Sequence, residues 1–254
     1  MKTKIISISS FLILLLPLLA HAGPPSRFTE LLPFVQQAPD QGRTGTCLYV
    51  GSTGVMELIA NKKHGIRNPK PYGLYDLNES FIIHTKSSAT EDHWFLEKHV
   101  LKFNIGYGVS TEALDFDVWN GSQTDRGVWE KRDWSKFPKT KLPAIETIQL
   151  FMEGDRWAKD VLDERHIEII KEAMWEHKSP VLISYNDNGF WHVISIVGYD
   201  DHIPGNCYQI SQEDCRSNEG SFYVRDSFGL TVELRDYDWF RKRGNTAVLV
   251  KEAR

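Results

Sequence analysis

The chain has little cysteine, no excess of positive charge and, after its first 22 residues, no long apolar run. Its 254 residues include 34 acidic and 30 basic side chains. This balance disfavours nucleic acid as a partner, because nucleic-acid-binding proteins present a basic face. No later segment reaches the roughly 20 apolar residues that a membrane-spanning helix needs. Repeats and low-complexity tracts are also absent. A composition of 41% hydrophobic and 25% charged residues is that of a globular protein.

The N-terminal 22 residues differ from the rest. Lys2 and Lys4 precede an apolar run over residues 11–19, and the segment ends at Ala20-His21-Ala22. A basic start, a short apolar core and an Ala-x-Ala end predict a secretory signal peptide that is cleaved after Ala22. A membrane anchor is the alternative, but the run is short and contains Pro17. We therefore expect an exported protein, periplasmic or extracellular, that has no membrane contact after cleavage and carries 28 basic against 34 acidic residues.

The three cysteines are Cys47, Cys207 and Cys215. Because export makes disulfides plausible, Cys207 and Cys215, which flank seven residues, suit a bridged loop or hairpin. Two unbridged thiols are the alternative. The pairing leaves Cys47 alone, and an odd thiol in an exported protein indicates a reactive role.

The first half of the chain has helical patterns. Residues 23–40 are proline-rich and are expected to be an extended lead-in. Apolar spacing predicts a helix from Cys47 to Asn61, with close packing of neighbours at Gly51 and Gly54 and a stop at Gly65. The remaining expected elements are helices starting near Leu77–Ser80 and over 94–103, a turn at 106–108, and a surface loop over 119–145.

The second half is richer in strands. An amphipathic helix is expected over 163–175, followed by strands at 180–185, 191–199, 221–225 and 247–251. This order predicts an α+β fold. We place a helical lobe at about 41–160 and a β-rich lobe at about 161–254.

Cys47 stands at the start of its predicted helix, where the helix dipole and free N–H groups favour a thiolate. Gln41, six residues upstream, has a side-chain amide that can donate to an oxyanion beside the sulfur. His192 follows a turn at the start of an apolar strand, where a ring can reach a cleft and act as a base. Asp226 ends another strand and can hold the second imidazole nitrogen.

Together these motifs resemble the papain-like cysteine peptidases. The resemblance rests on Gln41-Gly-x-x-Gly-x-Cys47, on the His192 strand with its Val-Gly-Tyr ending and on Asp226-Ser-Phe-Gly, with a Cys-to-His spacing inside the family's range. It implies a helical lobe and an antiparallel β-barrel-like lobe, with the active site in the cleft between them. Cys47 would be the nucleophile, His192 its base and then its acid, and Gln41 an oxyanion donor.

The sequence departs from the family at several positions. Asp226 replaces the family's orienting asparagine, Phe228 replaces a tryptophan, and Thr44 replaces a disulfide-forming cysteine. Gly106 and Gly108 only approximate the family's Gly-Gly substrate strand; with Trp191 they are our substrate-binding candidates.

The activity implied is hydrolysis of peptide bonds in peptide or protein substrates by a monomer. Two alternatives stay open: a transglutaminase-like acyltransferase or amidase on the same fold, and a catalytically inactive binding protein. His84, His93, His99 and Asp92 show no metal-ligand spacing, so we expect no metal and no cofactor.

Overall fold

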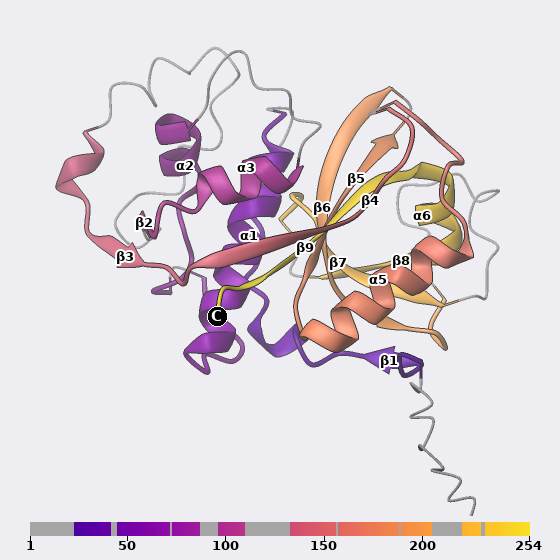
Figure 1. Ribbon diagram of the computed structural model, residues 1–254. Helices are drawn as coiled ribbons and strands as arrows, with labels where there is room; N and C mark the ends of the chain where they lie inside the picture. The colour runs from indigo at the N-terminus through magenta and orange to yellow at the C-terminus, as the bar shows by residue number, and fades with distance from the viewer. Residues whose placement is uncertain are drawn as a thin grey trace, which may run out of the picture.

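The computed structural model of the protein describes residues 23–41, 45–71, 73–86, 96–109, 133–155, 157–187, 189–204, 220–229 and 232–254. Helices α1, α2 and α3 gather on one side of the molecule, and a seven-stranded sheet with α5 and α6 forms the other (Figure 1). The helices are α1 (Cys47–Lys63), α2 (Glu79–Lys86), α3 (Leu96–Phe103), α5 (Glu164–His177) and α6 (Tyr237–Arg243), with short 3-10 turns η1 (Leu32–Phe34) and η5 (Trp134–Lys136).

Every strand pair among the described residues is antiparallel, and the large sheet has the order β4-β9-β5-β6-β7-β8, with β1 paired to β6. The strands are β1 (Arg27–Phe28), β4 (Ile145–Met152), β5 (Val181–Asp187), β6 (Phe190–Asp200), β7 (Ser221–Arg225), β8 (Glu233–Asp236) and β9 (Gly244–Glu252); β2 (Tyr107–Val109) and β3 (Lys139–Lys141) form a separate pair. Over the described residues the edge strands β4 and β8 do not pair, so the sheet stays open and does not close into a barrel.

The α+β fold class predicted from the sequence is confirmed. The helix expected from Cys47 is α1, and its final turn is followed by Gly65 at φ +67°. Asn78 caps α2, because its side-chain oxygen accepts a hydrogen bond from the Phe81 backbone N–H at 3.2 Å. Asp163 caps α5 in the same way through His166 N–H. These side-chain acceptors satisfy donors that a helix start leaves free.

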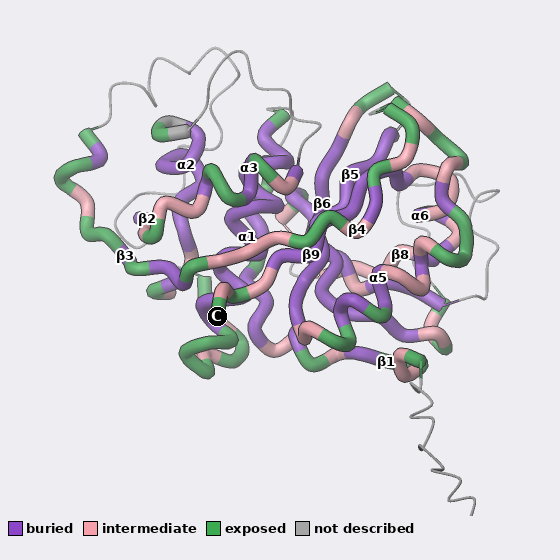
Figure 2. The backbone as a smooth tube through the Cα atoms, in the orientation of Figure 1, coloured by how far each residue is buried: buried purple, intermediate pink, exposed green. Residues whose placement is uncertain are grey.

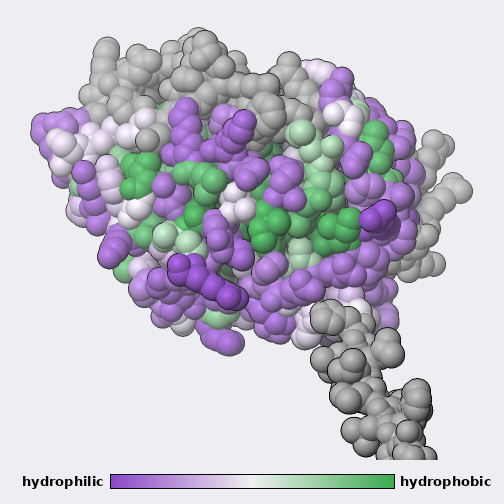
Figure 3. Space-filling view, viewed as in Figure 1, coloured by the Kyte–Doolittle hydropathy of each residue, from purple (hydrophilic) through white to green (hydrophobic). Residues whose placement is uncertain are grey.

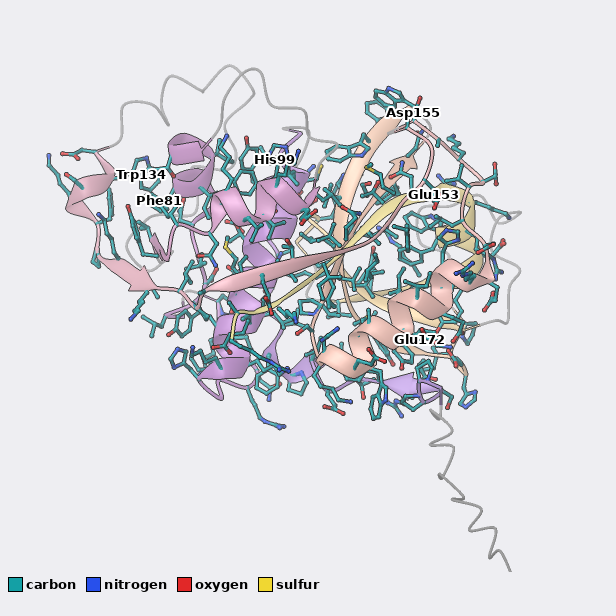
Figure 4. The ribbon with its side chains drawn as sticks, in the orientation of Figure 1. Phe81, His99, Trp134, Glu153, Asp155 and Glu172 are labelled. Carbon is teal, nitrogen blue, oxygen red and sulfur yellow. The ribbon has the colours of Figure 1, made fainter. Side chains whose placement is uncertain are left out.

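The structure differs from the sequence prediction in several regions, and strands β4 and β8 and helix α6 were not predicted at all. The turn expected at 106–108 is limited to Gly106, and Tyr107 begins strand β2. The segment over 119–145, expected to be a surface loop, contains strand β3. In the same segment Trp134 packs edge-on against Phe81 of α2, with ring centroids 5.4 Å apart (Figure 4). Strands β2 and β3 have only three residues each, which is too short to give an alternating pattern in the sequence.

Two apolar cores hold the molecule together. One surrounds α1, where α1, α2 and α3 pack on one another and on the large sheet, and the other lies between that sheet and helices α5 and α6. Figure 2 shows the central strands β5, β6 and β9 almost entirely buried. The lead-in at 23–40 packs into the second core, because Phe28 and Leu31 are buried there.

Apolar side chains also reach the surface. Figure 3 shows them across the middle of the face in view, where Figure 1 draws β4, and this edge strand exposes Ile148 and Met152. No helix among the described residues has the length and apolarity to cross a membrane. The expected signal peptide, residues 1–22, lies outside the described residues.

Candidate active site

Cys47 is the first residue of α1 and is 4% exposed. Its sulfur therefore sits where the first backbone N–H groups of a 17-residue helix have no partner within the helix. These groups and the helix dipole favour a negative charge at this position. Among the described residues Cys47 is a free thiol.

Close packing of α1 on the sheet positions this thiol. A Cβ atom added at Gly51 would lie 3.3 Å from side-chain carbons of both Leu182 and Val193. The hydroxyl of Ser195 also donates to the Gly51 carbonyl at 3.3 Å. The helix can cross β6 this closely because glycine has no side chain. The crossing brings the helix start to the part of β6 that carries His192.

His192 connects the thiol to a carboxylate. Its Nε2 lies 2.7 Å from Oδ1 of Asp226, and its ring also forms a side-chain hydrogen bond with Cys47. Because Nε2 is engaged by Asp226, Nδ1 is the ring nitrogen left for the sulfur. The structure thus brings together three of the four residues predicted from motifs, in the order thiol, imidazole, carboxylate.

The charges and hydrogen bonds around His192 and Asp226 favour an imidazolium next to a carboxylate. Burial by itself lowers the pKa of His192, but the hydrogen bonds to Asp226 and Cys47 outweigh it and raise that pKa from 6.5 to about 10. Burial raises the pKa of Asp226, yet the hydrogen bond with His192 and the charge of Arg235 leave that pKa below its usual value. Asp226 is therefore a carboxylate at neutral pH.

Aromatic rings enclose the imidazole. Phe228 stacks on His192 with ring centroids 5.5 Å apart and planes inclined by 4°, and Tyr185 approaches edge-on at 5.2 Å. Phe228 is 40% exposed, so it forms a partial cover between the imidazole and solvent. A cover of this kind strengthens the His192–Asp226 interaction by keeping water away from it.

Gln41 is buried beside the segment that carries Asp226. Its backbone N–H donates to the Ser227 carbonyl at 2.8 Å, and Asp40 forms a β-bridge with Phe228. The backbone contacts bring the fourth predicted residue to the same region. Its role as an oxyanion donor stays a prediction, and residues 42–44 lie outside the described residues.

Arg225, the residue before Asp226, fixes the carboxylate segment to α1, and the sequence analysis missed it. Its guanidinium donates to Glu57 Oε2 at 3.0 Å, to the Val50 carbonyl at 3.1 Å and to the Gln36 carbonyl at 2.9 Å. A Cβ atom at Gly54 would lie 2.1 Å from Arg225 Nη1, so any side chain there would displace the guanidinium. A buried arginine needs an acidic partner, and Glu57 on the apolar helix α1 was the available signal.

Arg235 on β8 is a second residue that the sequence analysis missed. It forms an ion pair with Asp226 Oδ2 and donates to Glu233 Oε1 at 2.7 Å and to the Tyr185 hydroxyl at 3.1 Å. It is 12% exposed at the side chain. Asp226 therefore has a cationic partner on each side.

The three candidates for substrate binding make their described contacts with the helical side of the molecule. Gly106 accepts a hydrogen bond from Leu142 N–H, and a Cβ at Gly108 would lie 2.9 Å from Leu77. Trp191 neighbours His192 on β6 and packs against the core on the helical side. Binding of substrate by these three residues stays a prediction. Cys207 and Cys215, the expected disulfide pair, lie outside the described residues.

An acidic cavity of about 220 Å³ adjoins this region, lined by Gln36, Gln37, Ala38, Pro39, Asp40, Pro71, Asp76, Glu79 and Gly229. Burial raises the pKa of Glu79 to about 8, so this carboxyl is largely neutral at pH 7.

Over the described residues no three His, Cys, Asp or Glu side chains gather into a metal site. In Figure 4, His99 lies on α3, apart from the acidic side chains Glu153 and Asp155.

No known family model and no curated protein sequence matches this chain. Solved structures do. The bromelain protease from Ananas comosus, solved in complex with the E64 inhibitor, matches with a TM-score of 0.51 and 12% identity over 90% of this chain and 100% of its own. Procathepsin L 3 from the larval midgut of Tenebrio molitor matches with a TM-score of 0.53 and 14% identity, over 91% and 71% of the two chains.

A third similar structure is bacterial. The cysteine protease and lectin-like domains of Cwp84, a surface layer associated protein of Clostridium difficile, match with a TM-score of 0.56 and 12% identity. The match covers 90% of this chain and 52% of that one. The fold is therefore papain-like, and at these identities the likeness extends to the fold alone.

Proposed function

We propose that this protein is an exported cysteine peptidase that hydrolyses peptide bonds through an acyl-enzyme on Cys47. The observation that carries the proposal is the contact chain from the Cys47 thiol through the His192 ring to Asp226. A thiol, a base and an orienting carboxylate in this order form the unit that nucleophilic acyl transfer requires. The papain-like fold supports the proposal.

In the proposed acylation step the Cys47 thiolate attacks the substrate carbonyl and a C–S bond forms. The carbonyl electron pair moves to oxygen, where the backbone N–H of Cys47 and the side-chain amide of Gln41 stabilise the negative charge. The His192 imidazolium then gives its proton to the amide nitrogen as the C–N bond breaks. Asp226 holds the ring in place through both events. An amine leaves and a thioester remains.

The test is hydrolysis of a mixed peptide library by the purified protein and by its Cys47→Ala variant. We expect the wild type to release new peptide N-termini, and the variant to lose at least about a thousandfold of this activity while keeping its thermal unfolding midpoint. Equal hydrolysis by the two proteins would contradict the proposal.

The same library separates the other activities that Cys47 could support. A transglutaminase-like enzyme would attach an added primary amine to substrate without releasing N-termini, and a binding protein would do neither. Either outcome would overturn the peptidase proposal.

Four further properties belong to the proposal. Cleavage after Ala22 delivers the protein outside the cytoplasm, a single peptidase domain spans 41–254, and it acts as a monomer. A disulfide joins Cys207 to Cys215. For the secreted protein, the N-terminal sequence tests the cleavage site and the size in solution tests the monomer. The intact mass before and after reduction tests the disulfide. A mature chain that starts elsewhere, a dimer, or a mass unchanged by reduction would contradict the corresponding one.

A further inference from the structure

The position of Arg235 is fixed from several directions. Its Nη1 donates to the Tyr185 hydroxyl on β5, its Nε donates to Glu233, and its Nη2 pairs with Asp226. Its guanidinium also lies 4.6 Å from the centre of the Trp239 ring on α6. A planar cation that is held along its edges and on one face has little freedom to turn.

Asp226 divides its two oxygens between two cations. Oδ1 accepts from His192 at 2.7 Å and from the Ser227 backbone N–H at 2.6 Å, whereas Oδ2 faces Arg235. The carboxylate is 3% exposed, so water contributes little to balancing its charge. Arg235 is consequently the principal counter-charge of Asp226 whenever His192 is neutral.

This counter-charge matters because His192 must both hold and release a proton. A buried, unbalanced carboxylate 2.7 Å from Nε2 would strongly favour the imidazolium. An imidazolium cannot accept a proton from water, so it is no base. A guanidinium on the far side of the carboxylate reduces that preference.

We propose that Arg235 is a positioning residue that fixes Asp226 and offsets its charge, so that His192 can act as a neutral base when the acyl-enzyme is hydrolysed. The inference rests on the proposed function. In this step a water molecule gives a proton to His192 while its oxygen bonds to the thioester carbon. The C–S bond then breaks, and the electron pair returns to sulfur as the Cys47 thiolate. The acid leaves and the imidazolium–thiolate pair is restored.

The need for Arg235 is greatest at this step. In the free enzyme Cys47 also helps to hold the proton on His192. In the thioester the sulfur carries no charge, so Asp226 is the charged group that faces the imidazole. The Ser227 hydroxyl, 3.4 Å from Nε2, and the rings of Tyr185 and Phe228 are its neutral neighbours. The charge balance between Asp226 and Arg235 then decides how often the ring is neutral.

The test is the Arg235→Gln variant with a nitrophenyl ester of an acylated amino acid, whose leaving group needs no proton. We expect kcat to fall about tenfold, because without Arg235 the Asp226 carboxylate favours the imidazolium and leaves less of His192 as the neutral base. KM should fall with it, and kcat/KM should stay within about twofold, because acylation does not need the neutral base. Mass spectrometry should show acyl-enzyme accumulating on Cys47.

Two variants control for fold. Arg241→Gln removes an arginine of α6 that pairs with Glu164 and Asp238 away from the site, and it should leave kcat unchanged. Arg235→Lys keeps the charge, so it should not accumulate acyl-enzyme even where Arg235→Gln is too unstable to assay. Accumulation in Arg235→Lys equal to that in Arg235→Gln would contradict the charge-offset role.

The decisive arm is the double variant Asp226→Asn/Arg235→Gln. Removing both charges leaves a neutral amide to orient His192, so kcat should recover to within about threefold of wild type, above either single variant. Losses that simply add would overturn the inference, as would an Arg235→Gln enzyme in which kcat and kcat/KM fall together without acyl-enzyme. A wild type that turns over no ester or peptide would instead overturn the proposed function.

Discussion

Two arginine–carboxylate pairs lie at the Asp226 segment, Arg225 with Glu57 and Arg235 with Asp226, and they differ in what surrounds them. Arg225 meets Glu57 and backbone carbonyls of α1 and the lead-in, and both side chains of this pair are 1% exposed. Arg235 meets Asp226, Glu233 and a phenol within the sheet. The first pair joins two parts of the fold, whereas the second touches the group that orients the base. The same chemistry therefore has a structural use in one place and an electrostatic use in the other.

The largest expected difference between the pairs is in stability. Arg225→Gln leaves Glu57 buried without a cation and should lower the free energy of unfolding by about 3–5 kcal/mol. Arg235→Gln should cost only about 1–2 kcal/mol, because Asp226 keeps His192 as a partner and Glu233 reaches solvent. Urea unfolding of the two variants measures this difference. Equal losses would remove the distinction between the pairs.

A substitution that changes no charge tests the contact by which Arg225 joins the Asp226 segment to α1. Gly54→Ala places a methyl group on the Arg225 guanidinium and should cost about 1–3 kcal/mol despite the gain in helix propensity. Gly51→Ala in the same helix is the matched control. Its methyl group would contact Leu182 and Val193 at 3.3 Å, so the clash is milder. If Gly51→Ala lowers the free energy of unfolding as much as Gly54→Ala does, the Arg225 contact with α1 has no special role in stability.

The Arg235 side of the comparison should appear in the response to pH. The folded-state pKa of His192 is raised from 6.5 to about 10, so its imidazolium stabilises the fold fully below pH 6.5. This contribution decreases as the pH rises and is gone above about 10. Between these two pH values the thermal unfolding midpoint should fall more with rising pH in the wild type than in His192→Gln. The kcat/KM of the wild type should also fall as the imidazolium is lost. Parallel pH profiles would show that His192 is not the titrating group.

The smallest expected effect is that of the aromatic cover. Phe228→Ala admits water beside the imidazole and should lower kcat by about three- to tenfold with little change in unfolding, because Phe228 is partly exposed. Phe228→Trp restores a stacked ring and should keep activity. An unchanged rate in Phe228→Ala would show that the Arg235 and Asp226 charges act without this shield.

The sequence predicted the elements of the site that carry strong local signals. Cys47 precedes a long apolar helix, and His192 starts an apolar strand after a turn, so both could be placed before the fold was known. Asp226 directly follows a short strand, and a matching motif located it. The fold class followed from the order of helices and strands.

Arg235 could not be predicted in the same way, because β8 is short and mostly polar, with the sequence Glu-Leu-Arg-Asp. Only pairing with β7 makes it a strand. Helix α6 did leave a readable signal, since Asp236 caps its start and basic residues fill its last turn. The ion pair joins residues nine apart in the chain across two strands, and no local pattern encodes such a contact.

The reactivity of Cys47 tests the central claim most directly. Iodoacetamide is added at about pH 6, where an ordinary thiol is almost entirely protonated, and the labelled cysteines are identified by peptide mass spectrometry. We expect Cys47 to be alkylated about tenfold faster than glutathione under the same conditions, and we expect His192→Ala to remove this advantage. Labelling of Cys47 no faster than glutathione, or undiminished in His192→Ala, would contradict the proposal that His192 activates this thiol.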